Sequence, residues 1–150
     1  MNFLIIGFGN PYRGDDGFGM RAAEAFEATN RDPSVRVEAA QELRPEFAEL
    51  ASRVDLLLFL DASVEGAPGV IKVQPVLPDE AAEEWFSHEL TPARLLAAAR
   101  VLYGRCPQAT MISVAGENFG FAEHLSPRVE AALPEVLQRM QEIIAAANSY

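Results

Sequence analysis

The chain has 150 residues, 49% of them hydrophobic, and its 22 Asp and Glu residues outnumber 12 Lys and Arg residues, giving a net charge of −10. This length and hydrophobic share predict one globular domain over 1–150 and exclude a disordered chain. The acidity argues against nucleic acid as a partner, because phosphate binding requires clustered Lys and Arg. A single cysteine, Cys106, excludes an internal disulfide or a thiolate metal cluster, which favours a reducing, cytoplasmic compartment.

The first apolar run, 3–6, predicts a buried strand that enters a loop rich in glycine over 7–19. The run is too short for a signal peptide or a membrane span, and no basic residue precedes it. From Phe18 onward the apolar positions take helical spacing, with Asp15 or Asp16 as the predicted N-cap. No segment of the chain is expected to cross a membrane.

The rest of the chain alternates between strand and helix patterns. Further strands are predicted at 35–39, 56–62 and 110–114, and further helices at 46–52, 91–102 and from Ser126 onward. Val70 to Pro75 is expected to pair as a hairpin with the preceding strand at a sheet edge, and Pro134 to bend the last helix or precede its start. The pattern predicts a single three-layer α/β/α domain whose twisted sheet is mostly parallel, with an antiparallel edge strand.

The loop at 7–19 has the glycines of a nucleotide-binding loop but not its charge. Asp15 and Asp16 would repel a phosphate, and the Gly-Lys-Ser/Thr ending of a phosphate loop is absent. Nucleotide binding is therefore disfavoured. The serines and Cys106 also lack the sequence context of a catalytic nucleophile.

Asp16 and Asp61 are the candidate site residues, because each follows or ends a predicted strand. In a sheet ordered 2-1-3 they emerge as neighbours at the edge where α/β folds bind ligands. Two close carboxylates repel each other unless a cation lies between them, so a metal ion is expected. His88 is the candidate third ligand, although a lone histidine is more often a surface residue, and His124 is a weaker candidate. Two oxygens and one nitrogen suit nickel or zinc.

Several motifs together resemble those of the nickel-iron hydrogenase maturation endopeptidases. They are Gly7-x-Gly9-Asn10, Gly14-Asp15-Asp16-Gly17-x-Gly19, Asp61-Ala62, His88 and Leu125-Ser126-Pro127. The resemblance spans nearly the whole chain. It implies an enzyme that removes the C-terminal extension of a hydrogenase large-subunit precursor after nickel insertion. It also implies that Asp16, Asp61 and His88 contact the metal.

The nickel is then expected to arrive with the precursor, and another divalent ion to be able to substitute for it. Either Asp16 or Asp61 is expected to act as general base, with Asp16 preferred, or the metal positions the scissile bond or the water itself. Many members have a Gly-Thr pair where this chain has 41–46, a segment more like that of proteases serving soluble, cofactor-reducing hydrogenases. A monomeric, cytoplasmic enzyme is expected. The alternative is a non-catalytic protein of the same fold that binds a metal or a partner during hydrogenase assembly.

Overall fold

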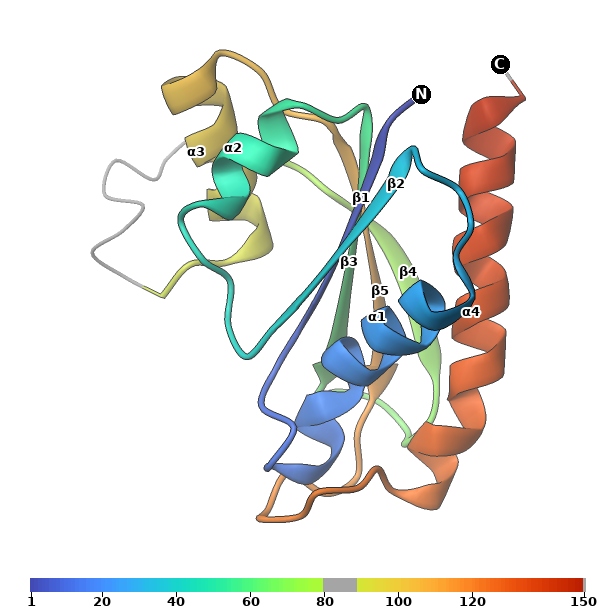
Figure 1. Ribbon diagram of the computed structural model, residues 1–150. Helices are drawn as coiled ribbons and strands as arrows, with labels where there is room; N and C mark the ends of the chain where they lie inside the picture. The colour runs from blue at the N-terminus through green and yellow to red at the C-terminus, as the bar shows by residue number, and fades with distance from the viewer. Residues whose placement is uncertain (80–88, 150) are drawn as a thin grey trace.

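A five-stranded sheet with helices on both faces forms the protein in the computed structural model, which describes residues 1–79 and 89–149 (Figure 1). The strands are β1 (Phe3–Phe8), β2 (Val35–Ala40), β3 (Leu56–Ser63), β4 (Ile71–Val76) and β5 (Gln108–Ala115). Their order is β2-β1-β3-β5-β4, and every neighbouring pair is parallel except β4 with β5. The predicted mostly parallel sheet with an antiparallel edge strand is confirmed.

Helices form the two outer layers. They are η1 (Gly14–Gly17), α1 (Phe18–Thr29), α2 (Phe47–Ser52), α3 (Pro92–Tyr103) and α4 (Pro127–Asn148). Figure 1 shows α1 and α4 on one face of the sheet and α2 and α3 on the other. Successive side chains of β1 alternate between the faces, so Ile5 packs with Phe18 and Met140, whereas Leu4 packs with Leu95. Burial on both faces explains why β1 and β3 are continuously apolar.

The edge strand β4 has a different partner from the one predicted. It pairs with β5, Ile71 opposite Val114 and Val76 opposite Ala109, and not with β3. The free side of β3 is already occupied by β5, which runs parallel to it along its whole length. The Gly69 N–H donates to the Ala115 carbonyl at 2.8 Å, so the turn after β3 is attached to the end of β5. The predicted β3–β4 hairpin is therefore wrong.

The helices on either side of β5 begin at the predicted residues. Thr91 caps α3 by accepting a hydrogen bond from the Arg94 N–H at 3.2 Å, and Gly104 ends the helix with φ of 79°. α4 begins at Pro127 and continues through Pro134, so the suggested later start is wrong.

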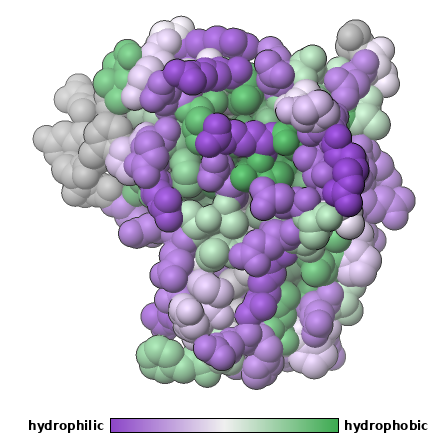
Figure 2. Space-filling view, in the orientation of Figure 1, coloured by the Kyte–Doolittle hydropathy of each residue, from purple (hydrophilic) through white to green (hydrophobic). Residues whose placement is uncertain are grey.

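On the face in Figure 2, hydrophilic residues predominate and hydrophobic residues show between them in small patches. No helix within residues 1–79 and 89–149 is long and apolar enough to cross a membrane.

Candidate active site

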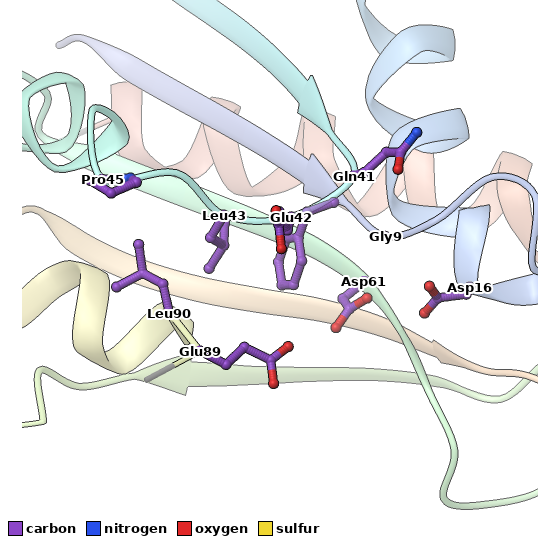
Figure 3. Close-up of a pocket in the computed structure, with 10 residues that line it drawn as sticks. Gly9, Asp16, Gln41, Glu42, Leu43, Pro45, Asp61, Glu89 and Leu90 are labelled. Atoms are coloured by element: carbon purple, nitrogen blue, oxygen red, sulfur yellow. The ribbon is translucent and has the colours of Figure 1, made fainter. Parts of the chain in front are cut away.

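The candidate site lies where β1 and β3 end. Asp61 is near the end of β3, and Asp16 is in η1, which follows the loop after β1. Since the two strands are parallel and pair Gly7 with Leu60, their ends meet at one edge of the sheet. Both carboxylates line a cavity of about 360 Å³, and Figure 3 shows the Asp16 side chain directed toward Asp61. The structure thus brings together two of the three predicted site residues. The third, His88, lies outside the described residues.

Glycines allow η1 and α1 to approach the strand ends closely. A Cβ at Gly19 would overlap the backbone carbonyl oxygens of Leu60 and Phe8. A Cβ at Gly9, whose φ is +135°, would overlap the carbonyl oxygen of Asp16. A larger residue at either position would therefore push Asp16 away from the end of β3.

Asp15 and Asp16 occupy opposite environments, and neither is the N-cap of α1. The N-cap is Gly17, which makes no side-chain hydrogen bond, because both aspartates are part of η1, the extra turn that precedes the helix. Asp16 is partly buried, and its carboxylate accepts a hydrogen bond from the Asn10 N–H at 2.8 Å. Asp15 is fully buried and is bonded to the loop before α4. The predicted capping role is wrong, and the role of Asp15 was missed.

The carboxyl group of Asp61 is in an unfavourable place for a negative charge. Burial raises its pKa to about 7. The Ala62 N–H, 2.8 Å from one carboxylate oxygen, opposes that rise, while the negative charges of Asp16 and Glu89 add to it. Asp61 is therefore partly protonated at neutral pH, and a nearby cation would favour its ionised form.

Known structures of the same fold were found by comparison. No protein-family model matches the chain, and no curated protein does. The hydrogenase maturating endopeptidase HybD from E. coli superposes with a TM-score of 0.77 at 26% identity, covering 98% of this chain and 94% of that one. An endopeptidase from Escherichia coli superposes with a TM-score of 0.73 at 27% identity, covering 93% and 90%. The chain thus resembles the hydrogenase maturation endopeptidases over nearly its whole length.

A third structure extends the likeness of the fold. The [NiFe] hydrogenase maturation protease HycI from Thermococcus kodakarensis has a TM-score of 0.77 at 23% identity, with 96% of this chain and 92% of that one covered. These similarities make the protein a hydrolase of the peptidase class, as predicted. They also argue against the alternative of a non-catalytic protein.

The cavity of this endopeptidase has a charged end and an apolar end. Around Asp16 and Asp61 the wall includes Glu89, while the side chains of Leu43 and Leu90 lie farther along it in Figure 3. Sequence analysis missed Glu89, although its place beside His88 was a usable signal. Among the described residues, no three His, Cys, Asp or Glu side chains are grouped to hold a metal ion by themselves.

His124 lies elsewhere in the protein. It lines a second cavity, with Arg21 and Glu24 of α1 and Glu130 of α4. Asp16 and Asp61 do not line that cavity, so the weaker candidate from the sequence is not at the site.

Proposed function

We propose that this endopeptidase removes the C-terminal extension of a [NiFe] hydrogenase large-subunit precursor, with Asp16 and Asp61 as the acting carboxylates and His88 as a further metal contact. The observation that carries the proposal is that Asp16 and Asp61 line one cavity at the carboxyl edge of β1 and β3. The likeness to HybD supports the hydrogenase as the source of the substrate. The reaction is proposed to take place in the cytoplasm, with the enzyme as a monomer.

Nickel enters this proposal as part of the substrate. The charges of Asp16, Asp61 and Glu89 make the cavity attractive to a cation, and two carboxylates with the imidazole of His88 form a donor set that suits nickel or a similar divalent ion. Three such ligands would leave coordination positions of a divalent ion open to the precursor. A bound divalent ion supplies polarisation of a carbonyl or of water.

The surroundings of Asp61 favour it as the general base, in place of Asp16, which sequence analysis preferred. A carboxylate accepts a proton more readily when the pKa of its acid is raised toward the working pH, and in the metal-free protein burial raises the pKa of Asp61 to about 7. In the proposed reaction Asp61 accepts a proton from water as the water oxygen attacks the scissile carbonyl carbon. The protonated Asp61 then donates that proton to the departing amine. Asp16, held by the Asn10 N–H, contacts the metal.

A processing assay tests the proposal. Nickel-loaded precursor is incubated with wild-type enzyme, Asp16→Asn, Asp61→Asn or Asp55→Asn, and the shortened product is measured by mass spectrometry. Asp55→Asn is the matched control, because Asp55 precedes β3 and lies at the opposite end of the strand from Asp61. We expect Asp16→Asn and Asp61→Asn to lose roughly 100-fold or more in rate, with the control unchanged. Wild-type rates in both site variants would overturn the proposal.

A further inference from the structure

Asp15 is a fully buried carboxylate that takes no direct part in the proposed reaction. Burial of a charge is costly unless hydrogen bonds compensate it. One oxygen of Asp15 accepts the N–H groups of Glu117 and Asn118, at 2.8 and 2.9 Å, and the Ser126 hydroxyl at 2.7 Å. The other oxygen accepts the Ser126 N–H at 2.7 Å. Four donors thus converge on this side chain.

All of these donors belong to the segment that joins β5 to α4. Ser126 is the N-cap of α4, so the carboxylate of Asp15 also faces the positive end of that helix. Backbone bonds strengthen the same connection, since the Gly14 N–H donates to the Ala122 carbonyl at 2.8 Å and the Asp15 N–H to the Asn118 carbonyl at 2.9 Å. Asp15 therefore attaches η1 to the β5–α4 segment.

This attachment determines the direction of Asp16. In a 3₁₀ helix, successive side chains project about one third of a turn apart. When Asp15 is fixed inward against the β5–α4 segment, its neighbour Asp16 is directed into the cavity, where it accepts the Asn10 N–H. We propose that Asp15 is a positioning residue that holds the Asp16 carboxylate toward Asp61 by bonding η1 to the β5–α4 segment. Its effect on the reaction rests on the proposed function.

Both carboxylate oxygens of Asp15, and not its shape alone, are required for this role, because together they accept four hydrogen bonds. An asparagine has nearly the same size, but one of its two oxygens is replaced by an amide N–H₂, which cannot accept a hydrogen bond from the donors around Asp15. Asp15→Asn therefore weakens the attachment with little change in volume.

The experiment compares Asp15→Asn with Asp55→Asn in the full chain. Asp55 is a suitable control, because its carboxylate also accepts a backbone N–H, from Asn2 at 2.8 Å, and a side-chain bond from Arg105 at 3.0 Å. The kinetic parameters kcat and KM are measured in the processing assay. The Asn10 amide is followed by NMR in the isolated enzyme, because its chemical shift reports the bond to Asp16.

We expect Asp15→Asn to lower kcat by roughly 10- to 100-fold with KM nearly unchanged, since a small misplacement of a reacting group has effects of that order. We also expect the Asn10 amide to move upfield and exchange faster with solvent. In Asp55→Asn, kcat and the Asn10 amide should match the wild type even where the melting temperature falls. An unchanged Asn10 amide in folded Asp15→Asn would overturn the inference, as would an equal loss of kcat in both variants.

Ser126→Ala keeps the inference testable if Asp15→Asn does not fold. This change removes the hydroxyl donor and leaves the other three bonds to Asp15 in place. We expect a smaller fall in kcat, with the Asn10 amide displaced in the same direction, and a wild-type Asn10 amide would contradict the positioning role. If wild-type enzyme does not cleave the precursor at all, the proposed function fails, while the Asn10 amide still decides the role of Asp15.

Discussion

Asp55 and Asp61 lie at opposite ends of the same strand, and their surroundings differ in the sign of the nearby charges. Asp55, just before β3, receives the Asn2 N–H and the guanidinium of Arg105, and these partners lower its pKa. Asp61, near the end of β3, has the carboxylates of Asp16 and Glu89 nearby, and burial raises its pKa to about 7. At one end of the strand the carboxylate has hydrogen-bond and cationic partners, whereas at the other end the nearby charges are negative.

This difference separates a structural carboxylate from a functional one. A partnered carboxylate such as Asp55 stabilises the fold when ionised, whereas an ionised Asp61 destabilises it. Perturbed groups of the second kind gather at active sites, because the missing positive charge is supplied by substrate, proton or metal. Each prediction below tests whether the two ends of β3 differ in this way.

The largest expected effect is on the pH dependence of processing. If Asp61 is the general base, kcat/KM follows its ionisation in the free enzyme and falls about tenfold per pH unit below about 7, or roughly 100-fold by pH 5. Rates at several pH values between 5 and 8 check this, with the buffer matched in ionic strength. Asp55→Asn should keep the wild-type profile. A rate that stays level down to pH 5 would exclude Asp61 as the base.

The next effect concerns stability. The pKa of Asp61 is raised in the folded state, so this group contributes stability below its unfolded value of 3.8, and that contribution is lost as the pH rises through about 7. The stability of Asp61→Asn relative to wild type should therefore be greater at pH 8 than at pH 5, by roughly 2 kcal/mol after allowance for the partial exposure of Asp61. Urea denaturation at both pH values measures this difference. An equal difference at pH 5 and pH 8 would show that ionisation of Asp61 does not lower the free energy of unfolding.

The sheet could be predicted from the sequence because its signals are local. Continuous apolar strands separated by helices indicate a parallel sheet, and a connection of that kind places β1 beside β3, which brings the residues after them to one edge. The approach of Asp16 to Asp61 thus follows from strand order and from glycines that lie next to the strand.

Two of the errors arose where distant residues decide the structure. The partner of β4 depends on β5, which comes more than 30 residues later in the chain and occupies the place beside β3. Asp15 has the pattern of a helix cap, yet its donors are 102 to 111 residues away. The local sequence around an aspartate does not show the hydrogen-bond donors that the tertiary fold brings to it from distant segments.

A smaller effect is expected from a divalent cation added to the isolated enzyme. Nickel chloride at pH 8 should raise the melting temperature by roughly 3 °C, because an ion that binds the folded state between Asp16 and Asp61 stabilises it. Thermal unfolding followed by circular dichroism measures the shift. Asp16→Asn should lose most of the rise, and Asp55→Asn should keep it. If the melting temperatures of Asp16→Asn and Asp61→Asn rise as much as that of wild type, the ion binds elsewhere.

The smallest effect is expected at the other end of β3, and its pH dependence has the opposite sign. Because its partners lower the pKa of Asp55, this carboxylate contributes stability above its unfolded value of 3.8, and the contribution is lost as the pH falls below that value. Asp55→Asn should thus melt slightly below wild type at pH 7, and the two should converge in acid, while processing is unchanged. The side chain of Asp55 is 38% exposed to solvent, so salt should reduce the difference. A deficit that grows in acid would mean that Asp55 resembles Asp61, and that the two ends of the strand do not differ in charge balance.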